Sequence, residues 1–523
     1  MTPDEQKIKC WLRILAFLLV GCAGFVLIIW MTSKRGVGVE GDGVFYIYMA
    51  RCLSGLDLFG WPSQGVSLWQ HYPPLFPIIM ALIHWLGGPD PLYTARWLNA
   101  FFFGMNICLV GILLYRYTKN FWLSMIGVSW MLVRIDNLYS YSMAMTEPLF
   151  IFLTLLWLFF ITDFMETKSR ISFGFCSMAA GLACLTRFAG IPLVLTGALL
   201  LFFQKDWLKS RIWAVAFGCL SLLPLTLWGV VNFLHSGHWT DRMISFHPLS
   251  ILGMKGYPGL INHLSTGETD LVLVLMLGMV LLGWMIFRNR DSWALKGVPN
   301  STMRFITIIV FFIFFYFVSW GIVVGFLDSL AKRGRYFLPV EVFELFFCLL
   351  CVHLLFSVTR SSRLLKSTFA ILLMTYVIGL NLPGALAWGV VRYNEGVAFD
   401  RREWDKSAII SEVKKISADT LIYSNNFMAL YFLTGRRALP LAYQKDPLSL
   451  RPNLAYNDQI KQMKEALSRQ RAVLVYGLMK FKMPGMVSEE ELKKEIPLKM
   501  LVKVADGQIY VYSPSIKESK STI

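Results

Sequence analysis

Two acidic residues, Glu40 and Asp42, lie among glycines in "GVGVEGDGVFYIYM", directly after the first long apolar segment of the chain. A third acid, Glu147, stands in "SMAMTEPLF", where another apolar segment begins. A carboxylate at a membrane surface can accept a proton from an attacking hydroxyl, and a water-poor surrounding makes it more basic. These acids are therefore candidates for acid–base chemistry.

Asp42 and Glu147 also have purely structural explanations. Asp42 could be the N-cap of the amphipathic stretch 43–56, a position that Asn fills as well as Asp. Glu147 follows Thr146, which can cap a helix, and precedes Pro148, which suits the first helical position. The acid would then only interact with the helix dipole. Replacing Asp42 by Asn separates the two roles, because Asn can cap a helix but cannot act as a base.

A cluster of basic residues occurs later in the chain, in "AKRGRYFLP" with Lys332, Arg333 and Arg335. The topology described below places this loop on the outer side of the membrane, where Lys and Arg are normally depleted. The charges could pair with nearby acids or contact lipid headgroups. An anionic ligand explains them better, because Arg187 lies on the same side and guanidinium matches phosphate in a bidentate geometry. We therefore expect these residues to bind a lipid phosphate.

The composition identifies a membrane protein. Of the 523 residues, 56% are hydrophobic and only 16% are charged, whereas soluble domains are about half apolar and a quarter charged. The apolar residues gather into runs close to the roughly 20 residues that cross a bilayer as a helix. Basic loops that orient such helices explain the formal charge of +17, so we expect no nucleic-acid partner. Nine cysteines, mostly inside apolar runs, give no disulfide framework.

The hydropathy pattern predicts a polytopic α-helical protein with about eleven spanning helices, near residues 12–31, 96–115, 121–136, 148–163, 171–186, 189–203, 211–234, 271–287, 303–326, 338–357 and 367–390. With the N-terminus in the cytoplasm, every predicted inner loop is basic, and the outer 137–147 loop has no Lys or Arg. An odd number of spans then places the C-terminal region outside. The segments 43–56 and 75–86 are predicted to be interfacial helices in the first outer loop.

Beyond residue 390 the sequence changes to that of a soluble domain. Strands are predicted in "TLIYSNN", "AVLVYGLM" and "QIYVYSP", and amphipathic helices in "EWDKSAIISEVKKI" and "YNDQIKQMKEALSRQ". Asp506 and Gly507 are typical of a hairpin turn. We therefore divide the chain into a transmembrane part, 1–390, and an extracytoplasmic α/β domain, 391–523. The inner loops contain no glycine-rich nucleotide-binding unit, so we expect no nucleotide cofactor.

Several short motifs, in their order, resemble those of the lipid-dependent GT-C glycosyltransferases. Asp42, with Tyr46 four residues later, is followed by "YPPLFP", "TEPLF", "TRFAGIPL" and "RGRYFLP". The likeness is strongest to the bacterial branch related to protein O-mannosyltransferases and lipid A aminoarabinose transferases, and it covers most of residues 1–390. The segment "IYSNNFMALYFLTGRRALP" also resembles the extracytoplasmic domain of bacterial members.

This resemblance implies an enzyme of the bacterial inner membrane that moves a sugar from a polyprenyl phosphate, such as undecaprenyl phosphate, to an acceptor hydroxyl with inversion. The acceptor would be another lipid, a glycan or a protein. The catalytic acid–base residue of the relatives falls on Asp42, and their second acid falls on Glu147. We expect the substrates to contact a further set of residues, namely Glu40, Tyr46, Tyr72, Arg187, Lys332, Arg333, Arg335 and Tyr336.

The chain departs from its relatives at two places. Relatives often have Asp-Glu where Asp42 is followed here by Gly43. Aminoarabinose transferases have Glu-Lys before the paired prolines, which gives a metal ligand and a phosphate contact, whereas this chain has His71 and Tyr72. His71 is still a candidate ligand for a divalent metal, or it forms hydrogen bonds in an interfacial loop. The phosphate contact must come from elsewhere, and the basic cluster is the candidate replacement.

Two other functions fit parts of the pattern. A transporter or flippase of lipid-linked glycans would also combine several spans with basic and acidic residues. However, the chain has no inverted repeat, and its acids lie near the surface rather than in the middle of the membrane. A polymerase or ligase of sugar chains uses similar lipid carriers. Sugar transfer by vesicles with the lipid-linked donor only on the outer side discriminates among these functions.

Overall fold

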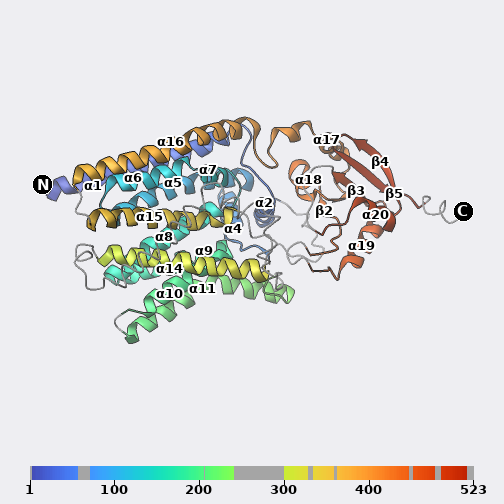
Figure 1. The fold of residues 1–523 in the computed structure, drawn as a ribbon. Helices are drawn as coiled ribbons and strands as arrows, with labels where there is room; N and C mark the ends of the chain where they lie inside the picture. Colours follow the sequence, from blue (N-terminus) through green and yellow to red (C-terminus); the bar gives the residue numbers. More distant parts are fainter. Residues whose placement is uncertain are drawn as a thin grey trace.

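The computed structural model describes residues 3–56, 71–204, 207–240, 300–327, 334–358, 362–446, 451–477 and 485–514. The first part of the chain forms a bundle of helices, and the last part combines a five-stranded sheet with short helices. The N-terminus lies at one end of the bundle, and the sheet lies beyond the opposite end (Figure 1). The helix α2 (Asp42–Leu53) occurs between the bundle and the sheet, and α4 (Leu75–Trp85) lies at this end of the bundle.

The helices of the bundle match the predicted spans closely. They are α1 (Pro3–Met31), α5 (Pro91–Thr118), α6 (Phe121–Val133), α8 (Glu147–Thr167), α9 (Arg170–Thr186), α10 (Ile191–Phe202), α11 (Trp207–Ser236), α14 (Asn300–Ile322), α15 (Leu338–Val358) and α16 (Arg363–Glu395). Short turns of other helical types occur at η1 (Phe188–Gly190), η3 (Val323–Leu327), η4 (Gly334–Phe337) and η5 (Arg402–Lys406). The predicted span 271–287 lies outside the described residues.

Burial distinguishes a central helix from helices that must face lipid. Within the described residues, seven helices are long and apolar enough to cross a membrane, and others, such as α6 and α9, are apolar but shorter. The most apolar window of α5 is 72% buried inside the protein, whereas that of α16 is only 11% buried. Exposed side chains such as Leu372 and Leu380 of α16 are unfavourable in water and favourable against lipid chains. The chain is therefore a polytopic membrane protein.

One predicted loop is partly helical. The sequence predicted a span up to residue 136 and a loop over 137–147, but α6 ends at Val133 and α7 (Ile135–Tyr141) follows it. Arg134, between the two helices, has an extended backbone, and its Nε lies 3.1 Å from a carboxylate oxygen of Glu341. Because this partner lies in another helix, α15, the break has no local sequence signal.

The C-terminal sheet has the order β2-β1-β3-β5-β4, with β1 parallel to β2 and β3, and β5 antiparallel to β3 and β4. Its strands are β1 (Leu421–Ser424), β2 (Ala438–Pro440), β3 (Ala472–Gly477), β4 (Leu498–Val504) and β5 (Gly507–Tyr512). Its helices are α17 (Ala408–Lys415), α18 (Phe427–Thr434), α19 (Tyr456–Ser468) and α20 (Glu489–Glu495). The turn at Asp506 joins β4 to β5, as predicted, whereas β2 is too short to leave a sequence signal.

Helix α2 is held from both sides. Tyr48 of α2 packs edge-on against Tyr431 of α18, with ring centroids 5.8 Å apart. Arg51, near the end of α2, forms two hydrogen bonds of 2.9 and 3.0 Å with Asp90, the N-cap of α5. The helix is thus anchored to both the bundle and the C-terminal domain, and Asp42 is its first residue.

Candidate functional site

Asp42 faces the bundle from the start of α2. The preceding Gly41 is the N-cap and has a φ of +40°, a backbone conformation that glycine adopts readily. One oxygen of Asp42 accepts a hydrogen bond from the Tyr72 hydroxyl at 2.9 Å, and the other pairs with Arg335. Since Gly41 occupies the N-cap position, Asp42 does not have the capping role that the sequence left open.

Glu147 is the first residue of α8 and is almost completely buried, with 1% of its surface exposed. Its Oε1 lies 2.8 Å from the guanidinium of Arg187 and 3.9 Å from Nε of Arg335. Its Oε2 is buried and has no hydrogen-bond partner in the described part of the chain. Thr146, the N-cap of α8, makes no side-chain capping bond and instead accepts from Arg187 at 2.9 Å. Glu147 is thus one partner in an ion-pair network.

Two arginines complete a group of four charges, of which Glu147 is buried and the other three are partly exposed. Arg187 follows the last residue of α9, and Arg335 lies in η4. Both guanidiniums lie over the ring of Tyr336, at 5.4 and 5.5 Å from its centroid, where the electron-rich face of the ring attracts cations. The carboxylates of Asp42 and Glu147 offset the repulsion between the two positive charges. We call Asp42, Glu147, Arg187 and Arg335 the charge cluster.

The charge cluster controls the protonation of Asp42. Burial alone would raise the pKa of this carboxyl group, but the charge of Arg335 and the hydrogen bonds from Tyr72 and Arg335 outweigh it and lower the pKa to about 2. Burial and the charge of Asp42 raise the pKa of Tyr46 above its ordinary value. At neutral pH the site therefore combines an ionised Asp42 with a neutral Tyr46.

Of the remaining predicted residues, the structure brings some into the site and not others. Tyr46 packs edge-on against Tyr72, with ring centroids 5.2 Å apart, and Tyr72 also contacts the ring of His71 at 4.4 Å. Glu40 lies in the turn before α2, and within the described residues its side chain has no hydrogen bond or ion pair. Lys332 and Arg333 lie outside the described residues. Of the basic cluster, the structure therefore places Arg335 in the site.

The described residues do not form a set of metal ligands. Within the described parts of the chain, no three His, Cys, Asp or Glu side chains come together in a way that could hold a metal ion. Asp42 and Glu147 are occupied by guanidinium partners, and His71 contacts an aromatic ring. The described residues thus offer His71 no further donors for the divalent metal that the resemblance suggested, and we derive no step through it.

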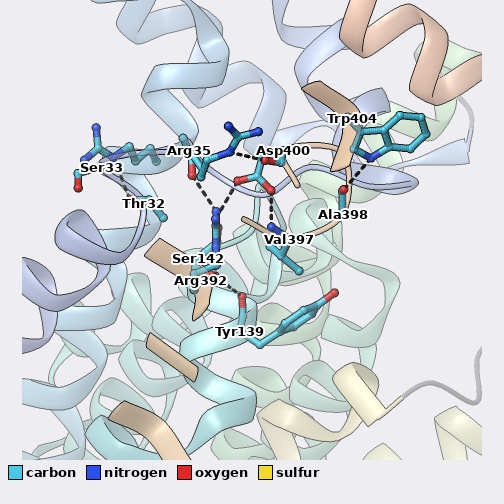
Figure 2. A network of polar contacts seen from close by, with 12 residues as sticks. Thr32, Ser33, Arg35, Tyr139, Ser142, Arg392, Val397, Ala398, Asp400 and Trp404 are labelled. Atoms are coloured by element: carbon cyan, nitrogen blue, oxygen red, sulfur yellow. Dashed lines mark hydrogen bonds and ion pairs between the residues drawn. The ribbon is translucent and has the colours of Figure 1, made fainter. Parts of the chain in front are cut away.

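Sequence reasoning missed a second buried ion pair close to the site. Arg392, in the last turn of α16, pairs with Asp400 at 2.8 Å, and both side chains are buried (Figure 2). The available signal was an arginine at the end of a long apolar helix with an acid eight residues later. That signal is weak, because basic residues at the ends of membrane helices are common.

Solved structures share this fold at low sequence identity. No protein-family model matches the sequence, and no curated protein does. ArnT from Cupriavidus metallidurans bound to undecaprenyl phosphate has a TM-score of 0.57 and 12% identity, over 96% of this chain and 99% of that chain. The apo state of ArnT has a TM-score of 0.57 and 13% identity, over 98% of this chain and 99% of that chain. The apo oligosaccharyltransferase of Archaeoglobus fulgidus has a TM-score of 0.50 and 9% identity, over 89% of this chain and 69% of that chain.

These similarities establish the fold. ArnT is a lipid A aminoarabinose transferase, and both neighbouring proteins have the GT-C fold. The GT-C resemblance carried by the sequence motifs is thereby confirmed for the architecture. The chain is a polytopic membrane protein with the GT-C fold and a small C-terminal α/β sheet.

Proposed function

We propose that this protein is a glycosyltransferase that moves a sugar from a polyprenyl-phosphate donor to an acceptor hydroxyl, with inversion at the anomeric carbon. The observation that carries the proposal is the charge cluster, which combines a base for a hydroxyl with positive charge for a phosphate. The fold supports the proposal, because ArnT was solved with undecaprenyl phosphate bound. The acceptor is a lipid, a glycan or a protein.

In the proposed reaction, the acceptor oxygen attacks the anomeric carbon while the bond from that carbon to the phosphate oxygen breaks. Asp42 takes the proton of the acceptor hydroxyl. The electron pair of the broken bond leaves with the polyprenyl phosphate, which gains negative charge. Arg335 and Arg187 stabilise this charge in a buried setting, where electrostatic interactions are stronger than in water. Inversion follows because the acceptor and the leaving group lie on opposite faces of the sugar.

The contact between Arg335 and Asp42 gives the donor a means of activating the base. In the absence of ligand, Arg335 holds the pKa of Asp42 at about 2, so the carboxylate is a weak base. A donor phosphate beside Arg335 offers this guanidinium a second anion and weakens its hold on Asp42. Burial, which raises the pKa of a carboxyl group, then has the larger influence. Asp42 thus becomes basic when the donor is in place.

Glu147 has a secondary role in this proposal. Its Oε1 orients Arg187 through the 2.8 Å ion pair. Its buried Oε2, which has no hydrogen-bond partner among the described residues, is available to a hydroxyl of the acceptor. Buried carboxylate oxygens normally accept hydrogen bonds, so a hydroxyl of the acceptor that donates a hydrogen bond to Oε2 would remove the cost of leaving this oxygen unpaired. Glu147 therefore positions the acceptor while Asp42 removes its proton.

We place the reaction at the outer face of a bacterial inner membrane, with the N-terminus in the cytoplasm and residues 391–523 outside. The basic loops between the predicted spans support this orientation. The arrangement of the molecule is compatible with it, because α2 and the C-terminal sheet lie at the end of the bundle opposite the N-terminus (Figure 1).

The Asp42→Asn variant tests the proposal. We expect sugar transfer to slow by roughly 10²–10⁴-fold, because a general base is lost, while folding and donor binding stay close to normal. The measurement is product formation by mass spectrometry, in vesicles that hold the lipid-linked donor only in the outer leaflet. Asp136→Asn is the matched control: it makes the same exchange at a half-exposed acid that pairs with Arg134 at 3.2 Å and lies outside the charge cluster.

Near-normal transfer by Asp42→Asn would remove Asp42 from the chemistry. Movement of the donor across the membrane by the wild-type protein, without any transfer, would indicate a transporter instead.

A further inference from the structure

Three chain segments that are distant in sequence meet beside the charge cluster. Gly38 forms a parallel bridge with Met143, and Val39 forms a parallel bridge with Ala398. Gly38 N–H donates to Ser142 O at 2.9 Å, and Ala144 N–H donates to Gly38 O at 2.8 Å. These bridges connect the segment before α2, the segment before α8 and the first residues after α16.

The register of the first bridge relates the two acids of the site to each other. Asp42 lies four residues after Gly38, and Glu147 lies four residues after Met143. Each acid is also the first residue of its helix, α2 or α8. A change in this register or in the separation of the two segments would therefore displace one carboxylate relative to the other.

Arg392 contacts all three segments (Figure 2). Its guanidinium donates to Gly36 O at 2.7 Å and to Ser142 Oγ at 3.4 Å, and it pairs with Asp400 Oδ2 at 2.8 Å. The side chain is fully buried, with 0% of its surface exposed. A planar guanidinium with several fixed donors is suited to such a contact, and an ammonium group is not.

Asp400 connects Arg392 to the first residues after α16. Its Oδ1 accepts from Val397 N at 2.7 Å, which shapes the turn that holds Ala398 against Val39. Its backbone oxygen accepts from Arg35 Nε at 2.9 Å, just after α1. The Arg392–Asp400 pair therefore links the end of α16, the start of the C-terminal region and both acid-bearing segments.

We propose that Arg392, held by Asp400, is a positioning residue that sets the relative placement of Asp42 and Glu147 through the Gly38–Met143 bridge. The catalytic part of this inference rests on the proposed function, since it assumes that both carboxylates must meet the same substrates. Arg392 acts through the backbone of the two segments.

The test uses Arg392→Lys and Asp400→Asn in the full-length protein. Arg392→Lys keeps the positive charge but cannot reach the three segments with a fork of donors. Asp400→Asn keeps the oxygen that accepts from Val397 N and is the milder change, so it remains informative if Arg392→Lys fails to fold. Asp405→Asn is the matched control, because it removes an ion pair with Arg35 in the same region (2.7 Å) whose acid is half exposed.

We expect hydrogen–deuterium exchange to become faster in residues 36–44 and 142–147 of both variants, and to remain unchanged in Asp405→Asn. We also expect kcat, measured per folded protein, to fall at least about tenfold with little change in the KM for the lipid-linked donor. A variant that was only less stable would lose folded protein without changing kcat.

Unchanged exchange in both variants would overturn the proposal, and so would faster exchange with a normal kcat. An equal fall in kcat for Asp405→Asn would overturn it as well. If the wild-type protein transfers no sugar, the proposed function fails, and the exchange data still decide whether Arg392 holds the bridge.

Discussion

At the scale of single residues, the site depends on which anion Arg335 contacts. In the structure this guanidinium pairs with Asp42 and lies 3.9 Å from Glu147, while Arg187 contacts Glu147 from the other side. Each carboxylate has a cationic partner, so the four charges balance without a ligand. A phosphate that enters the cluster adds negative charge and must change these pairings. This exchange predicts a distinctive dependence of the rate on pH.

For the wild-type protein we expect the acid limb of kcat to lie at higher pH than the acid limb of kcat/KM. The profile of kcat/KM reports the free enzyme, in which the pKa of Asp42 is about 2, and kcat reports the complex, in which the phosphate shares Arg335. The measurement is the two pH profiles with a lipid-linked donor. Coincident acid limbs would contradict the exchange of partners.

Arg335→Gln should bring the two limbs together at a higher pH, because only the Tyr72 hydrogen bond and the charge of Arg187 then oppose the effect of burial on the pKa of Asp42. The rate should also fall about ten- to more than a hundredfold, since a charge-assisted contact contributes roughly 1.5–3 kcal/mol.

The change in the free energy of unfolding of Arg335→Gln has a defined sign. The depressed pKa of Asp42 stabilises the wild-type fold above the ordinary carboxyl pKa of 3.8, and this contribution disappears as the pH falls toward about 2. Acid unfolding monitored by circular dichroism should therefore begin at higher pH in the variant.

At the scale of elements, the site is built where two helices begin. Helices α2 and α8 each begin with an acid of the charge cluster, and η4 contributes Arg335. The starts of the two helices are close together, because a Cβ on Gly43 would lie only 2.8 Å from the backbone oxygen of Ala144. Glycine at this position lets α2 approach the segment before α8.

Gly43→Ala should lower kcat by roughly 10–10²-fold, because a displacement of about 1 Å at a site can have an effect of this size. Alanine is normally better than glycine inside a helix by about 1 kcal/mol, so a loss of activity would point to the clash with Ala144. Gly379→Ala in α16 is the control, since a Cβ there would meet no atom within 4 Å. The measurements are kcat and thermal unfolding of the purified variants. Equal kcat values for both variants would show that the close approach is not required.

At the scale of the whole molecule, the bundle and the C-terminal domain enclose α2 between them. The helices that expose the most apolar surface, such as α16, lie on the outside of the bundle, where a membrane would cover them. The sheet lies beyond the end of the bundle at which the acids occur. Under the proposed function, a lipid-linked donor would approach from the membrane and an acceptor beside the C-terminal domain.

This arrangement predicts the topology of the chain. A reporter that is active only outside the cytoplasm should be active when fused after Asn425 and inactive when fused after Lys119, because the loop at Lys119 is one of the predicted basic inner loops. A cytoplasmic location of Asn425 would contradict both the orientation and the proposed reaction on the outer face. A reporter that is active only in the cytoplasm provides the reciprocal control.

The amino-acid sequence by itself determined the class of the protein, most helix positions and the strands β1, β3 and β5. Runs of apolar residues and their periodicity are local properties, and a helix such as α8 begins within one residue of its predicted start. The motifs also selected Asp42, Glu147, Arg187 and Arg335 as candidates.

Only the tertiary structure decided which of these residues meet. Arg335 and Asp42 are 293 residues apart in the chain, and Arg392 reaches Ser142 across 250 residues. Such contacts depend on how all the helices between them pack. Packing also removes the water that would otherwise satisfy each charge, so the charged side chains must find partners in the protein. For the same reason the break at Arg134 left no readable pattern in the sequence, and the junction around Arg392 left only a weak one.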